Sequence, residues 1–282
     1  MRVRVVFGVV LAVVLIAGIG LYVALRDGDI ELPDVRPRSC TVQADGRVTL
    51  GPSQMANAAT IAALGIRRGL PERAVVVALA TAFQESKMEN LAGGDRDSIG
   101  LFQQRPSQGW GTPQQIRDPR YAAGMFYRNL VKVPNWQRMR VTDAAQAVQK
   151  SAHPNAYEQW ADEATVLTTA LLGRATGAVA CVYPGEPSVR GATAATALAN
   201  QLKLDWGEVR PVDSEVIGLT LRVRDTRVGW QYAHWLVSHG SQHGVMRVRF
   251  DSLEWTAKGG AWSRVDNQGG AAGERVIAEV YA

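Results

Sequence analysis

The chain has 282 residues, 46% hydrophobic and 20% charged, so it holds enough apolar material for packed cores and is neither mainly disordered nor collagen-like. A mean hydropathy of -0.09 excludes a protein built of many membrane-spanning helices. The formal net charge of +5 comes from 31 Lys and Arg against 26 Asp and Glu. The basic residues form no long run, so no nucleic-acid partner is expected.

An apolar segment stands near the start of the chain. No charged residue occurs between Val5 and Leu25, and a helix of this length spans a hydrocarbon layer of about 30 Å. Two arginines precede it, which favours a cytoplasmic tail at residues 1–4 and an extracytoplasmic location for the bulk of the chain. We therefore expect a single-pass membrane anchor at 5–25 and a Pro-containing linker at 26–39. The alternative is a cleaved signal peptide and a secreted protein.

The two cysteines, Cys40 and Cys181, lie far apart in sequence. Neither has a second Cys or a His nearby at the spacing of zinc ligands, so no metal site and no cofactor are expected. In an oxidising compartment such a pair closes a long loop. The sequence predicts one disulfide that encloses residues 40–181.

Two helices are predicted after the first cysteine. Apolar residues recur at helical spacing over 54–68, and Pro71 then opens a second helix whose interior, 74–83, carries no charge. A helix that is apolar all round is buried. Glu85 follows, and the residues three, four and seven positions before it are Ala, Thr and Ala. Such a wall raises a carboxyl pKa and suits a general acid, whereas the alternative is a helix-end Glu that meets solvent.

The segment 90–111 combines Gly and Asp with the amides Gln103 and Gln104 and with Trp110 between two glycines. Amide groups and a flat ring bind sugar hydroxyls and pyranose faces at low cost in side-chain entropy. This segment is therefore a candidate glycan-binding loop.

Two motifs in this region resemble a known superfamily. Gln84-Glu85-Ser86, followed by Asp-Ser-Ile-Gly-Leu-Phe-Gln at 97–103, is similar to the signatures of soluble lytic transglycosylases and goose-type lysozymes. The segments 94–111, 118–123 and 144–149 further resemble a group of actinobacterial membrane-anchored, lysozyme-like proteins.

The resemblance implies a mainly α, lysozyme-like domain at 40–182 that acts on the glycan strands of peptidoglycan. Glu85 would be the catalytic acid that protonates the glycosidic oxygen and then acts as base. Asp95 and Asp97 would assist if a water were the nucleophile, and the alternative for both is local turn bonding. The residues expected to contact sugar are Ser98, Gly100, Gln103, Gln104, Trp110, Gln149 and Tyr157.

Four of these positions carry alternatives, and for Gln103, which matches the superfamily by position only, the alternative is a structural role in the loop. The superfamily has an Ala-Tyr-Asn-Ala-Gly element late in the domain, and the nearest segment here, 147–151, lacks its tyrosine. Tyr157 or Gln149 would serve in its place. Trp110 is either a sugar platform or a core residue.

A Pro/Gly-rich stretch at 183–192 predicts a domain boundary, and helix and strand periodicity beyond it predicts a small α+β domain at 193–282. Arginines on its strands face either an anionic polymer or solvent. His239 and His243 have metal-chelating spacing but no third ligand nearby, so ordinary packing is favoured. An envelope protein partner of this domain is a further hypothesis.

The predicted fold class is thus a mainly α lysozyme-like domain followed by a small α+β domain, with an N-terminal transmembrane helix. The predicted function is cleavage of peptidoglycan glycan strands, with lytic cleavage preferred to hydrolysis. The alternative is a protein that binds wall glycan as a scaffold without cutting it.

Overall fold

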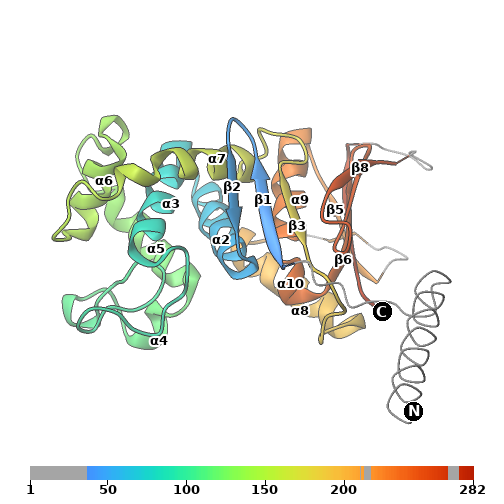
Figure 1. Ribbon diagram of the computed structural model, residues 1–282, viewed down its shortest axis with the longest axis horizontal. Helices are drawn as coiled ribbons and strands as arrows, with labels where there is room; N and C mark the ends of the chain where they lie inside the picture. Colours follow the sequence, from blue (N-terminus) through green and yellow to red (C-terminus); the bar gives the residue numbers. More distant parts are fainter. Residues whose placement is uncertain (1–36, 210, 213–216, 266–272) are drawn as a thin grey trace, which may run out of the picture. The chain divides into compact units, whose positions relative to one another are not determined.

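The computed structural model describes residues 37–209, 211–212, 217–265 and 273–282 (Figure 1). Within them, Pro37–Ala282 form one compact unit. The α-helices are α2 (Pro52–Arg67), α3 (Glu72–Ser86), α4 (Pro113–Ile116), α5 (Pro119–Leu130), α6 (Val141–Gln149), α7 (Ala161–Leu171), α8 (Gly191–Trp206), α9 (Thr226–Ser238) and α10 (Gly240–His243). Three single-turn helices are η1 (Pro106–Gln108), η2 (Trp136–Arg138) and η3 (Glu158–Trp160).

The strands form two antiparallel sheets, one with the order β2-β1-β3 and one with the order β4-β5-β9-β6-β7-β8. Their bounds are β1 (Ser39–Gln43), β2 (Arg47–Leu50), β3 (Val179–Val182), β4 (Pro211–Val212), β5 (Gly218–Arg222), β6 (Val245–Phe250), β7 (Leu253–Thr256), β8 (Trp262–Arg264) and β9 (Arg275–Val280).

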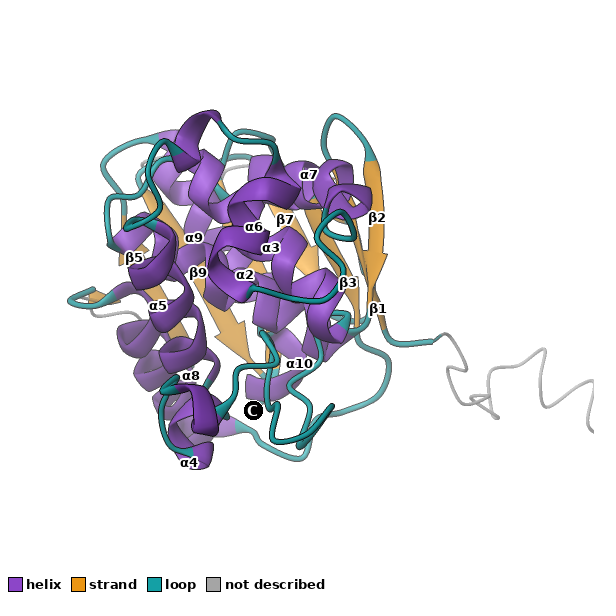
Figure 2. Cartoon of the chain, turned by 90° about the vertical axis from the view of Figure 1, so that its left-hand side faces the viewer, coloured by secondary structure: helices purple, strands orange, loops and turns teal. Residues whose placement is uncertain are grey.

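This architecture corrects the predicted fold class. A mainly α domain followed by a separate small α+β domain was expected, but helices and two sheets pack together in one unit, and the predicted linker at 183–192 lies inside it. The reason is α9, which is buried nearly all round. It contacts β6 and β9 of the larger sheet on one side and α2 and α7 on the other, so the two halves share a core. Figure 2 shows the helices in front of the orange strands of this sheet.

The predicted tail at 1–4, the anchor at 5–25 and most of the linker at 26–39 lie outside the described residues. In the part of the chain that is described, no helix combines the length and apolar character needed to cross a bilayer. That finding corrects the transmembrane component of the fold class. It also corrects the predicted localisation as a single-pass membrane protein, because no described helix could serve as the span.

Local sequence predicted the central helices well. The expected helices at 54–68 and from Pro71 onward are α2 and α3, and every residue of 74–83 is buried. The helix α3 contacts α2, α5, α6 and α7, which explains why its interior carries no charge. The lone polar group there, Thr81, donates its hydroxyl to the carbonyl of Val77 at 2.7 Å. The helix therefore holds its C-terminal residues on a rigid support.

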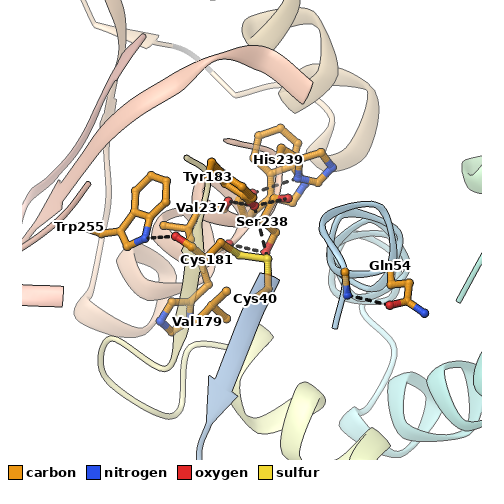
Figure 3. Close-up of a disulfide and its surroundings, with 12 residues drawn as sticks. Cys40, Gln54, Val179, Cys181, Tyr183, Val237, Ser238, His239 and Trp255 are labelled. Carbon is orange, nitrogen blue, oxygen red and sulfur yellow. Dashed lines mark hydrogen bonds between the residues drawn. A yellow bond between two sulfur atoms is a disulfide. The ribbon is translucent and has the colours of Figure 1, made fainter. Parts of the chain in front are cut away.

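The disulfide predicted between Cys40 and Cys181 is confirmed (Figure 3). The two residues are directly opposite one another in the ladder between β1 and β3, 141 positions apart in sequence. The indole of Trp255 in the larger sheet donates to the carbonyl of Cys181 at 2.9 Å. The hydroxyl of Tyr183 donates to the carbonyl of Val237 in α9. The bridged sheet is thus tied to the C-terminal half as well as to the helices.

A buried carboxylate makes a second connection between the halves. Asp205 in α8 is 0% exposed and accepts hydrogen bonds from Thr60 of α2 and from the indole of Trp235 of α9, both at 2.9 Å. Arg120 of α5 pairs with it at 2.7 Å. Because an unpaired buried charge is costly, all four helices must keep this arrangement.

Candidate functional site

Glu85 lies in the last turn of α3, half-buried, where the helix ends in a left-handed Lys87. The neighbouring Ser86 is buried, and its hydroxyl donates to the carbonyl of Leu101 at 2.8 Å. This bond connects the end of α3 to the segment 90–111 that follows it. The Glu-Ser pair therefore positions the predicted binding loop beside the predicted acid.

Two donors hold one oxygen of the Glu85 carboxyl. The hydroxyl of Tyr157 donates to Oε1 at 2.6 Å, and the side-chain amide of Gln149 donates to the same atom at 3.1 Å. Among the described residues, no hydrogen bond reaches Oε2 and no Lys or Arg forms an ion pair with this carboxyl. When Glu85 is protonated, the proton therefore resides on Oε2, because Oε1 is occupied as a double acceptor.

Burial raises the pKa of Glu85 above its ordinary value, and the hydrogen bonds from Tyr157 and Gln149 lower it by a smaller amount. The shift has the direction predicted from the apolar wall of α3. The pKa of Tyr157 is raised as well, mainly by burial and next by the charge of Glu85. Its hydroxyl therefore stays protonated and can donate.

The two donors come from a distant part of the chain. Gln149 is the last residue of α6, and its amide also donates to the carbonyl of Phe102 at 2.7 Å. Tyr157 is fully buried just before η3. Both were predicted to contact sugar, but the structure places them against the carboxyl. Gln149 also faces the cleft, whereas Tyr157 is not among the residues that line it.

A cleft of about 710 Å³ opens beside Glu85. It brings together seven residues singled out in the sequence, namely Glu85, Asp95, Ser98, Gln103, Gln104, Trp110 and Gln149. Three others, Asp97, Gly100 and Tyr157, do not line it. The lining that sequence reasoning missed consists of Arg96, Arg105, Gln108, Lys150, Ser151, Ala152 and His153. Arg96, Arg105 and Gln108 belong to the predicted loop but were not singled out within it. The other four follow α6 and reach the cleft through the packing of α6 and its following loop against α3, and of these only His153 was considered as a groove residue, with helix-to-loop packing as the alternative.

The two aspartates have different surroundings. Asp97 accepts hydrogen bonds from the guanidinium of Arg105 at 2.7 Å and from the backbone N–H of Ser107 at 2.8 Å. These bonds, the Ser107 one foremost, hold the pKa of Asp97 well below its ordinary value. Asp97 therefore has the local hydrogen bonding that was the alternative to a catalytic role for both aspartates. The side chain of Asp95 is 92% exposed on the cleft wall, and its nearest cation is Arg96 at 3.9 Å.

The loop itself is shaped by glycines. A short antiparallel bridge joins Ile99 and Gln104, and Gln103 adopts a left-handed conformation between them. A Cβ on Gly94 would lie 1.7 Å from Oε1 of Gln103, so only glycine lets this amide lie across the loop. Gly100 also has positive φ, and a Cβ on it would lie only 2.8 Å from the carbonyl oxygen of Ile116. Its role is to turn the chain.

Of the remaining predicted residues, some line the cleft and some also hold the surrounding structure in place. Ser98 is buried in the cleft wall. Gln104 is buried as well, and its amide donates to the carbonyl of Ala122 in α5 at 3.0 Å. Trp110 is half-buried between Gly109 and Gly111, both of which have positive φ. It packs against the core and also lines the cleft, so it is in part a core residue, and its role as a sugar platform stays a prediction.

The C-terminal histidines have structural surroundings. His234 accepts from the backbone N–H of Ala178 and lies 2.8 Å from the carbonyl of Ala170. Burial lowers the pKa of His234 and of His239 to about 4. No group of three or more His, Cys, Asp or Glu within the described ranges is arranged to hold a metal ion. On the strands, Arg247 and Arg249 pair with Glu254 and Glu279.

The sequence was compared with known proteins. Neither a scan against protein-family models nor a search of curated proteins finds a match.

Proposed function

We propose that this protein cleaves the glycan strands of peptidoglycan by a lytic route, with Glu85 as the acid and then the base. The observation that carries the proposal is the Glu85 carboxyl, half-buried at a cleft, with Oε1 held by Tyr157 and Gln149 and Oε2 left for the transferable proton. A raised pKa suits a group that must hold a proton near neutral pH.

In the first step, Oε2 of Glu85 gives its proton to the glycosidic oxygen as the bond from that oxygen to C1 breaks. The acetamido group of the sugar that contains this C1 stabilises the positive charge that develops there. In the second step, the Glu85 carboxylate removes the proton of the C6 hydroxyl, whose oxygen bonds to C1. The product is a 1,6-anhydro sugar, Glu85 regains its proton, and no water is consumed.

The surroundings of the two aspartates favour this route over hydrolysis. Inverting hydrolysis needs a second carboxylate that acts as base on a water. Asp97 is committed to Arg105 and Ser107, and it does not line the cleft. Asp95 is almost fully exposed. A mechanism in which the substrate supplies its own nucleophile needs neither of them. Gln103, Gln108 and the ring of Trp110 provide the amides and the flat face that hold sugar.

The test is to incubate the full chain with purified peptidoglycan sacculi and to measure product masses. Anhydro products, one water lighter than reducing ends, are expected. Glu85→Gln should lower the rate by about 10²–10⁴-fold, the usual contribution of a positioned general acid. Glu89→Gln, a nearby glutamate outside the cleft lining, is the matched control. Products with reducing ends would mean that the protein hydrolyses the strands and does not use the lytic route. Binding of strands without any product would leave the non-catalytic scaffold function, and retained activity in Glu85→Gln would refute the assignment.

A further inference from the structure

The cleft beside Glu85 does not end at Trp110. A second hollow of about 910 Å³ lies between α5 and α6, and its lining includes Gln108, Trp110, Gln149 and Lys150, all of which also line the first. Shared walls on this scale make the two hollows sections of one groove. A strand bound at Glu85 would therefore extend past Trp110 into the second section.

The second section is cationic. Arg128 lies in the last turn of α5, Lys132 lies just beyond that helix, and Lys150 directly follows α6. The lining of this section contains no Asp or Glu, and none of these three cations forms an ion pair with any residue of the described chain. Like charges gathered in the lining of one hollow repel one another, and a bound anion would relieve that repulsion.

The same section is also lined by apolar side chains and by an amide. Met125, Val133 and Pro134 supply apolar surface, and Asn129 supplies an amide. A ligand that uses all of these carries small alkyl groups, amide bonds and carboxylates together. A short peptide with free carboxylates has this composition, whereas a phosphodiester polymer would use the cations alone.

We propose that this cationic section binds the carboxylate-bearing peptide attached to the glycan strand, so that the protein selects strands that still carry their peptides. The inference rests on the proposed function, because it assumes a glycan strand at Glu85. The cations then act on a substituent beside the bond to be cut, and the apolar residues contact the alkyl part of that substituent.

Calorimetric titration of the full chain carrying Glu85→Gln tests the proposal, since this background prevents turnover. The ligands are glycan strands with their peptides, the same strands freed of peptide by an amidase, and poly(glycerol phosphate). Strands with peptides should bind about five- to ten-fold more tightly than strands without them, the effect of two or three exposed charge pairs. Arg128→Gln with Lys132→Gln should remove most of that difference, and Arg138→Gln, an exposed cation outside both linings, should leave it in place.

Equal affinity for the two kinds of strand would overturn the inference, as would a double variant that weakens both to the same extent. Tighter binding of poly(glycerol phosphate) than of peptide-bearing strands would overturn it in favour of a phosphate polymer. If strands are cleaved by the unsubstituted protein but bind without a peptide preference, the proposed function stands and this inference fails. If neither strand binds, both fail.

Discussion

The hydroxyl of Tyr157 donates a 2.6 Å hydrogen bond to Oε1 of Glu85, although 72 positions separate the two residues in sequence. Burial of the carboxyl favours its protonated form, and this bond favours the charged form. Burial is the larger influence, so the pKa stays above its ordinary value. Tyr157 thereby tunes an acid whose burial is set by α3.

Replacing Tyr157 with Phe should move the pH dependence of activity. The variant keeps the ring in its buried place but removes a donor to the carboxylate, so the pKa of Glu85 rises further. The alkaline limb of kcat/KM should therefore shift to higher pH, because the reaction needs Glu85 protonated at the start. A stability loss of about 1 kcal/mol is expected for the lost bond. An alkaline limb that stays in place or moves to lower pH would contradict this role.

Glu85→Gln should stabilise the protein, increasingly so as pH rises. Because the folded-state pKa of Glu85 is raised above its unfolded value, the folded state binds more protons, and the group lowers the free energy of unfolding as pH rises through the folded pKa. Gln keeps the Oε1 acceptor and does not ionise. The Tm difference between variant and parent should therefore widen from acidic to neutral pH, by about 2–4 °C for each kcal/mol. Thermal melts that give a constant or narrowing difference would contradict the raised pKa.

Asp97→Asn should loosen the loop without moving the pH profile of catalysis. The carboxylate holds Arg105 and the N–H of Ser107, and its lowered pKa means that this contribution is present above the unfolded pKa and is lost as pH falls through the folded one. Faster amide exchange across 97–107 is expected, together with reduced activity at every pH. Asp95→Asn, at an exposed neighbour, should leave the exchange rates unchanged. A shifted pH profile would instead make Asp97 a participant in proton transfer.

Asp205→Asn should destabilise the whole unit. The substitution leaves Arg120 without its buried partner, and breaking such a pair costs about 3–5 kcal/mol. Asp118→Asn is the matched control, since Asp118 also contacts Arg120 but is exposed, and Asn retains the helix cap at the start of α5. Urea unfolding should give a single transition with a lower midpoint for Asp205→Asn. Two separate transitions would mean that the halves unfold independently of this carboxylate.

Much of the candidate site was predictable because its signals are local. The uncharged stretch 74–83 predicted a buried helix, and the small residues before Glu85 predicted a raised pKa. The Gly-rich segment predicted a loop, and Gly94 stands where a Cβ would collide, while Gly100, Gly109 and Gly111 have positive φ. These features depend on neighbours within a few positions, which sequence spacing reveals directly.

The rest depended on packing between distant segments. Tyr157 and Gln149 were predicted to contact sugar, but their hydrogen bonds to the Glu85 carboxyl were not predicted, because they arise only where the loop after α6 returns to the end of α3. The expected boundary at 183–192 looked like a break because it is rich in Pro and Gly, yet such residues equally make a turn within one unit.

By itself, the sequence determined the buried helix, the disulfide pair and the acid at the end of an apolar wall, because periodicity, cysteine count and side-chain volume act over short distances or need no geometry at all. Only the tertiary structure decided which oxygen of Glu85 accepts hydrogen bonds, that Asp97 pairs with Arg105, and that three cations at or just beyond the ends of α5 and α6 line a continuation of the groove. The contacts at Glu85 join residues 64 and 72 positions apart, and the direction of a side chain across such a gap is set by the packing of whole helices rather than by any local pattern. Even the pair of Asp97 and Arg105, eight positions apart, depends on how the loop between them folds.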